Sequence, residues 1–164
     1  DGPFSDKRLA RLQFAAALGE AAHRRMAKGE SLAEAARMAA EEQQRDGSWR
    51  VSEGIGSPAT WGNALATALA RQAIVRLDKG RKEAVRRADA WLRKAESESV
   101  LDASGILIGL GRATDEAARK QRARCLAILE RGEGKEGGWG PRESAPAEVF
   151  DTAVAVLALA AQEE

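Results

Sequence analysis

The sequence has little of several residue types, and each shortage narrows what the chain can be. Its single cysteine, Cys125, excludes an internal disulfide. Its apolar runs are shorter than the roughly 18 residues that a membrane-spanning helix needs, so we expect no membrane span. The 26 Lys and Arg residues are interleaved with 25 Asp and Glu residues, and this balance predicts no nucleic-acid binding.

The composition favours helix almost throughout. Tyrosine is absent and β-branched residues are sparse, while alanine, leucine, arginine and glutamate dominate, so we expect an all-α chain. A length of 164 residues suits a single domain, 1–164. Because the chain begins at Asp1 rather than Met, we expect a processed product or an excised piece of a longer chain. The lack of a leader or a disulfide framework favours the cytoplasm.

Apolar spacing and cap residues predict about seven helices. Ser31 and Glu34 form a capping-box pattern at the start of the second helix, and Thr114 is expected to cap the sixth. The expected helices cover residues 5–28, 31–44, 59–77, 82–97, 103–111, 115–131 and 148–161.

These helices alternate in polarity. The second, fourth and sixth are charged and amphipathic, whereas the third, fifth and seventh are apolar nearly all round. The alternation predicts stacked helical hairpins in which outer helices cover buried inner ones. The inner helices also align without gaps when Asn63, Asp102 and Asp151 share one column, and each of these residues can cap a helix.

Two loops share the unusual pattern Gln/Glu-x-x-x-Gly-x-Trp. We expect the Gln or Glu to reach exposed N–H groups of a neighbouring inner helix, the Gly to permit a tight reversal, and the Trp to pack over the polar side chain. The tryptophans are therefore expected to anchor the loops rather than to contact a ligand. The matching residues are Gln43, Gly47 and Trp49 in the first loop, and Glu133, Gly137 and Trp139 in the second.

This pattern resembles the QW repeat of the squalene cyclase and prenyltransferase superfamily, over roughly residues 31–161. A third, eroded copy contains Trp91, Leu92 and Glu96 but lacks the Gly-x-Trp ending. The resemblance implies an α/α toroid of inner and outer helices, of which this chain supplies about half a ring. It also implies that the chain belongs to a longer polypeptide, pairs with a second copy, or binds a ligand on its concave surface.

The sequence lacks the motifs with which that superfamily performs chemistry. Neither the DxDD acid motif nor the DDxxD metal motif is present, and Cys125 and His23 do not have the spacing of zinc ligands. We expect Cys125 to be a small core residue and His23 to be a solvated helix residue. We therefore expect no catalytic residue, metal or cofactor in this chain.

The leading hypothesis is a noncatalytic repeat module that acts as a scaffold or binds an apolar or isoprenoid ligand. The alternative is a fragment or half-ring of a terpene cyclase-like or prenyltransferase-like enzyme that acts on isoprenoids, with Asp102 or Asp151 as the nearest acid. A third hypothesis is a protein interaction domain that uses its charged outer helices. The candidate ligand-facing residues are Trp61, Asn63, Asp102, Phe150 and Asp151.

Overall fold

A computed structural model describes residues 7–24, 30–51 and 62–163. In these ranges the chain forms seven α-helices and no sheet, which confirms the all-α class. The candidate Trp61 lies outside the described residues. The helices are α1 (Lys7–His23), α2 (Glu30–Glu41), α3 (Gly62–Leu77), α4 (Lys82–Leu92), α5 (Val100–Leu110), α6 (Glu116–Gly132) and α7 (Val149–Glu163).

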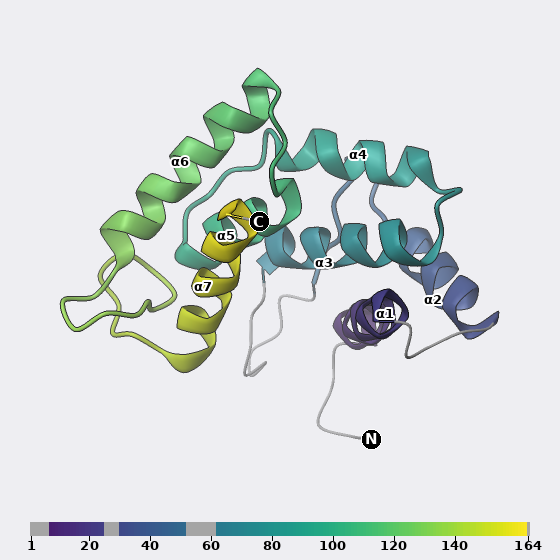
Figure 1. The fold of residues 1–164 in the computed structure, drawn as a ribbon, viewed down its shortest axis with the longest axis horizontal. Helices are drawn as coiled ribbons and strands as arrows, with labels where there is room; N and C mark the ends of the chain where they lie inside the picture. Colours follow the sequence, from purple (N-terminus) through teal and green to yellow (C-terminus); the bar gives the residue numbers. More distant parts are fainter. Residues whose placement is uncertain (1–6, 25–29, 52–61, 164) are drawn as a thin grey trace.

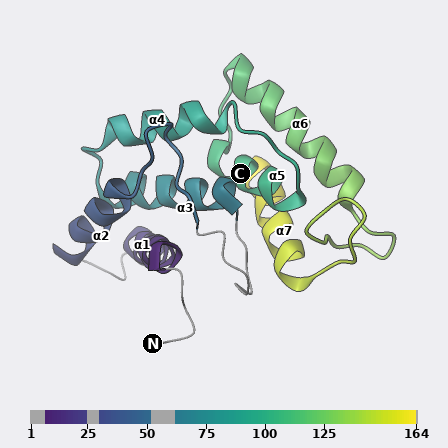
Figure 2. The same cartoon turned by 180° about the vertical axis from the view of Figure 1, so that it is seen from behind.

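The helices form an inner row with outer helices packed on it, which is a helical-repeat arrangement. The inner row is α1, α3, α5 and α7, in which each helix packs on the next. The outer helices α2 and α4 pack on α3, and α6 packs on α5. Figures 1 and 2 show α4 and α6 along one edge of the molecule, with α3, α5 and α7 inside them. No helix in the described ranges has both the length and the apolar character to cross a bilayer.

Small residues bring α3 and α5 close together. A Cβ atom at Gly105 of α5 would collide with the backbone nitrogen of Leu65, and one at Gly109 would lie 3.1 Å from the Cβ of Ala68. Glycine at these positions lets the two backbones approach further than larger side chains would. The inner helices are therefore spaced by their small residues.

The buried side chains gather into two clusters, and each cluster contains one of the loop tryptophans. Trp49 packs in the cluster that α1, α2 and α3 share, with Leu12 and Ile74. Trp139 packs in the cluster around α5, with Ile106 and Leu129. Each tryptophan therefore ties its loop to a local core.

Several predicted helix ends are wrong, such as the end of the second helix, which lies at Glu41 rather than residue 44. Local hydrogen bonds explain three others. The sixth helix is capped by Asp115 rather than Thr114, because the Asp115 carboxylate accepts a hydrogen bond from the Ala118 N–H at 3.0 Å. The fifth starts at Val100 because Ser99 caps it in the same way. The fourth ends at Leu92 rather than residue 97, where the Asp89 carbonyl accepts hydrogen bonds from both the backbone N–H and Nη1 of Arg93.

The expectation that α7 is buried like the other inner helices is only half right. Its buried residues, among them Val154, Ala155 and Ala158, lie on the side that packs on α5. On other sides Val149, Val156 and Leu157 are exposed. An apolar helix at the end of a row has a neighbour on one side only, so half of its apolar surface stays uncovered.

Candidate functional site

The first loop, residues 43–49, is a tight reversal after α2. The Gln44 N–H donates to the Ser48 carbonyl at 2.8 Å, and the Gly47 N–H donates back to the Gln44 carbonyl at 3.0 Å. Gly47 has a φ of 97°, which a residue with a Cβ adopts only with strain. The predicted role of Gly47 in the reversal therefore has a direct geometric basis.

Trp49 fastens this loop to two helices. Its indole Nε1 donates to the Ala39 carbonyl at 2.6 Å, and its backbone N–H donates to Thr67 Oγ1 at 2.9 Å. The Ala39 carbonyl belongs to the last turn of α2, where no further helical N–H can reach it. The fully buried tryptophan thus supplies a hydrogen-bond donor to the last turn of an outer helix and binds an inner helix through Thr67.

The second loop, residues 133–139, repeats this geometry. The Gly134 N–H donates to the Gly138 carbonyl, and the Gly137 N–H, with a φ of 84°, donates to the Gly134 carbonyl. Trp139 Nε1 donates to the Leu129 carbonyl at 2.8 Å, and the Trp139 N–H donates to Thr152 Oγ1 at 2.9 Å. In both loops the tryptophan binds the carbonyl that lies ten residues before it and a threonine of the following inner helix.

The first residue of each loop behaves differently from the expectation. Gln43 does not reach inner-helix N–H groups, because its Nε2 donates to the Ala84 carbonyl of the outer helix α4 at 2.9 Å. Arg87 of α4 donates to Gln43 Oε1 in turn. In the second loop Glu133 is exposed, and its side chain has no hydrogen bond or ion pair with the described residues. The polar residue therefore joins neighbouring hairpins only in the first loop.

The two threonines were missed in the sequence, and they also correct the alignment of the inner helices. Since Thr67 and Thr152 make the same hydrogen bond, they are equivalent. The column that contains Asn63 then contains Glu148 rather than Asp151, so the gap-free alignment is wrong by three positions. A threonine among the alanines and leucines of two inner helices was the available signal.

A groove of about 580 Å³ crosses the inner row on the surface of α1, α3, α5 and α7. Leu69, Ile108 and Leu157 are among its apolar walls, and the predicted candidate Phe150 also lines it. Its volume is in the range of small-molecule sites, which are mostly apolar with a few polar groups. The full lining is Ala16, Glu20, Leu65, Leu69, Gln72, Ala73, Arg76, Ile108, Phe150, Ala153, Val154, Leu157, Ala160 and Ala161.

The charged side chains of the groove are gathered on α1 and α3. Arg76 Nη1 lies 2.8 Å from Glu20 Oε2, and Gln72 lies one turn away from Arg76 on α3. A hydrogen bond from Arg24 and the charge of Arg76 lower the pKa of the Glu20 carboxyl. The α7 side of the groove carries no ionisable residue. The groove is therefore polar on one side and apolar on the other.

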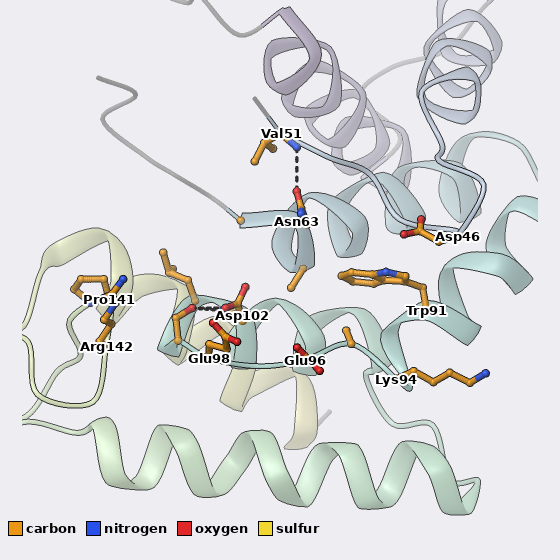
Figure 3. Close-up of a pocket in the computed structure, with 15 residues that line it drawn as sticks. Asp46, Val51, Asn63, Trp91, Lys94, Glu96, Glu98, Asp102, Pro141 and Arg142 are labelled. Atoms are coloured by element: carbon orange, nitrogen blue, oxygen red, sulfur yellow. Dashed lines mark hydrogen bonds between the residues drawn. The ribbon is translucent and has the colours of Figure 1, made fainter. Parts of the chain in front are cut away.

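A second hollow, the end pocket, lies where α3 and α5 begin (Figure 3). It contains two predicted candidates, Asn63 and Asp102. Asn63 Oδ1 accepts a hydrogen bond from the Val51 N–H at 3.2 Å, and Asp102 Oδ2 accepts one from Ser99 Oγ at 2.7 Å. The Trp91 indole extends from α4 to its wall. Both candidates thus hold local backbone or cap structure while also facing the pocket.

The remaining candidate, Asp151, lines neither hollow. It is 3% exposed, and its Oδ1 has no hydrogen-bond partner in the described part of the chain. Burial, and secondarily the charge of Glu148, raise the pKa of its carboxyl above the usual range. The structure therefore places Asn63 and Asp102 together, Phe150 in the groove, and Asp151 in the interior.

Cys125 and His23 lie far apart in burial and do not form a common site. Cys125 is buried in α6, and burial raises the pKa of its thiol to about 11. His23 is exposed at the end of α1. Within residues 7–24, 30–51 and 62–163, no three His, Cys, Asp or Glu side chains gather in a way that could hold a metal ion.

Comparison with protein-family models, with curated proteins and with solved structures gives no match for this chain.

Proposed function

We propose that this protein is a noncatalytic helical-repeat module that binds an elongated apolar ligand in the groove of its inner row. The observation that carries the proposal is the groove itself, whose walls are mostly aliphatic and include Leu157, a residue that is 62% exposed. A large exposed apolar side chain in a concave surface is typical of a binding site.

The shape and polarity of the groove favour a chain-like ligand with one polar end. Leu69, Ile108 and Leu157 would contact the apolar part, since they come from three successive inner helices. Arg76 and Gln72 would accept the polar end, because they are the hydrogen-bond donors of the lining. The resemblance of the two loops to the QW repeat supports an isoprenoid as the first ligand to test.

The test is an NMR titration of the intact chain with farnesol, a fifteen-carbon isoprenoid alcohol. We expect shifts of the methyl signals of Leu69, Ile108 and Leu157, and a loss of affinity of about tenfold or more in Leu157→Asp. Val75→Asp is the matched control, because Val75 is also an exposed aliphatic residue on an inner helix but lies outside the groove. Equal affinities in the two variants would contradict the proposal.

The alternative, a half-ring of an isoprenoid enzyme, is favoured by one observation. Asp102 faces the end pocket beside Asn63 and Trp91, where a carboxylate could meet a substrate. The test is to incubate the intact protein with squalene and with farnesyl diphosphate. Turnover that disappears in Asp102→Asn would support the enzyme and overturn the noncatalytic proposal.

A further inference from the structure

The side of α7 that faces away from α5 carries an apolar stripe. Val149, Ala153, Val156 and Ala160 recur at steps of four, three and four residues, so they lie on one face of the helix. All are exposed, Val149 at 90% and Val156 at 51%. We call these residues the α7 stripe.

The first half of the same face of α3 is covered, whereas Val75, at the position of Ala160, is exposed. The equivalence of Thr67 and Thr152 places Ala64 and Ala68 of α3 at the positions of Val149 and Ala153. Ala64 and Ala68 are buried, because Gly105 and Gly109 of the next inner helix, α5, pack on them. The first half of the α7 stripe, Val149 and Ala153, is therefore the surface on which one more inner helix would pack.

In the layer of the outer helices, the second loop has an open surface that matches the α7 stripe. In the first loop a Cβ atom at Gly47 would collide with the Arg87 carbonyl of α4, whereas a Cβ atom at Gly137 would have nothing within 4 Å. Gln43 is bonded to α4, whereas Glu133 is exposed. In the described part of the chain, the position that α4 occupies against the first loop is thus open at the second.

We propose that the α7 stripe and the second loop together form a docking site for one further helical hairpin of the α4–α5 kind. Its inner helix carries Gly or Ala at a spacing of four residues, as Gly105 and Gly109 do against α3. Its outer helix carries Arg or Lys against Glu133, as Arg87 lies against Gln43. The docking site shares Ala153 and Ala160 with the wall of the ligand groove, but it takes a different partner and goes beyond the proposed function.

Two interfaces within the chain predict a positively charged residue on the docked outer helix. Trp91-Leu92 stands before Glu96 at the same offset as Ile128-Leu129 before Glu133, which aligns the buried Ala88 of α4 with the buried Cys125 of α6 and Arg87 with Arg124. Arg124 lines the same hollow as Glu98, in the chain segment between α4 and α5. Both outer helices therefore carry an arginine toward the neighbouring segment, and an arginine or lysine opposite Glu133 would form an ion pair.

A second copy of this chain fits the docking site poorly. Its free end would offer α1 as the inner helix and α2 as the outer helix. Since the buried Ala35 of α2 is equivalent to Ala88, Glu34 stands at the position of Arg87. Glu34 would meet Glu133, and juxtaposed like charges oppose association. The charge pattern therefore favours a hairpin with a basic outer helix over self-association.

The experiment extends the intact chain after Glu164 with a second copy of residues 80–111. The equivalence of Thr67 and Thr152 puts residue 79 at the position of Glu164, so this extension keeps the register of α4 and α5. The measurement is hydrogen exchange, resolved to peptides that cover residues 133–138 and 149–161. We expect exchange of both segments to slow by about tenfold or more. Unchanged exchange would overturn the proposal.

Charge exchange tests the specific contact without disturbing the fold. Arg87→Glu in the appended copy is expected to remove the added protection, and Glu133→Arg is expected to restore it in the same chain. Glu136→Arg is the matched control, because its first-loop counterpart Asp46 bonds to Ser48 rather than to α4. Rescue by both substitutions alike would contradict the assigned contact.

Sedimentation of the chain without the extension tests whether a second copy of the chain occupies the docking site instead of a basic hairpin. A monomer that Val156→Asp leaves unchanged is the expected result. A tight dimer that Val156→Asp dissociates would show that a second copy covers the α7 stripe, and it would overturn the choice of a basic helical hairpin.

Discussion

The first loop and the second loop have the same backbone hydrogen bonds but different surroundings. In both, an indole N–H meets an outer-helix carbonyl and a threonine hydroxyl accepts the tryptophan N–H. The first loop lies under α4, which contacts Gly47 and binds Gln43. Among the described residues no helix covers the second loop in this way, and Glu133 is exposed.

This difference distinguishes two roles of the residues in the shared sequence pattern, namely anchoring a loop to its own hairpin and joining that hairpin to the next. Trp, Thr and the positive-φ Gly hold each loop to its own hairpin, because they make the same contacts whether the loop is covered or not. Gln43 joins one hairpin to the next, because its partner lies on α4. Substitutions of the first group should therefore act alike in both loops, and substitutions at the joining positions should not.

The largest expected effect distinguishes the two glycines. Gly47→Ala should destabilise the protein by ~3 kcal/mol or more, because it adds a collision with the Arg87 carbonyl to the strain of positive φ. Gly137→Ala should cost only ~1 kcal/mol, from the strain alone. Urea unfolding of both variants measures the difference, and equal losses would remove the distinction between covered and open loops.

The tryptophans should respond in parallel. Trp49→Phe and Trp139→Phe each delete an indole N–H and leave the carbonyl of Ala39 or Leu129 without a partner, so each should cost ~2 kcal/mol. Thermal unfolding followed by circular dichroism compares them. A loss confined to Trp49→Phe would mean that the second loop is not held by the same contacts.

The first residues of the loops should again differ. Gln43→Ala removes hydrogen bonds to Ala84 and Gly47 and leaves Arg87 without its acceptor, so a loss of ~1–2 kcal/mol is expected. Glu133→Ala should leave the stability unchanged, since the side chain is exposed and has no partner in the described part of the chain. Urea midpoints with an unchanged m-value are the measurement. A substantial loss in Glu133→Ala would reveal an unrecognised partner.

The smallest effect compares the inner helices of the two loops. Asp151 of α7 and Ala66 of α3 are equivalent and both are buried. Because burial raises the pKa of Asp151, its ionisation lowers stability as pH rises from its unfolded pKa through its folded pKa.

Asp151→Ala should thus stabilise the protein by ~1 kcal/mol at pH 7, since it removes a buried carboxylate whose Oδ1 is unpaired. The gain should shrink as pH falls through the folded pKa and should be smallest below the pKa of the unfolded carboxyl, where Asp151 is protonated in both states. Stability curves at several pH values check this. A gain that grows toward low pH would reverse the assigned sign.

The sequence was sufficient to predict the helical class and both reversals, for physical reasons that act locally. Three- and four-residue apolar spacing marks a helix wherever it falls, and Gly47 and Gly137 mark turns that need positive φ. Helix ends were less predictable because several polar residues compete to cap them. At the start of α6 the carboxylate of Asp115 caps the helix although Thr114 precedes it.

Contacts between distant segments could not be predicted from local spacing. Gln43 has the same sequence surroundings whether it faces an inner or an outer helix, and only packing decides that it meets Ala84. The candidate ligand-facing residues divided for the same reason. Asn63 and Asp102 come together at one end, whereas the turn of α7 directs Asp151 into the interior. The alignment of Thr67 with Thr152 could not be predicted either, because it follows from the hydrogen bonds that both threonines accept from the loop tryptophans.

The most direct test is to measure hydrogen exchange of the indole N–H groups of Trp49 and Trp139 by nitrogen-15 NMR. The variants Trp49→Phe and Trp139→Phe assign the two indole signals. Both indole protons are expected to exchange slowly, because both are hydrogen-bonded to carbonyls of outer helices in buried surroundings. Fast exchange at either tryptophan would contradict the claim that the covered and the open loop share one set of anchoring contacts.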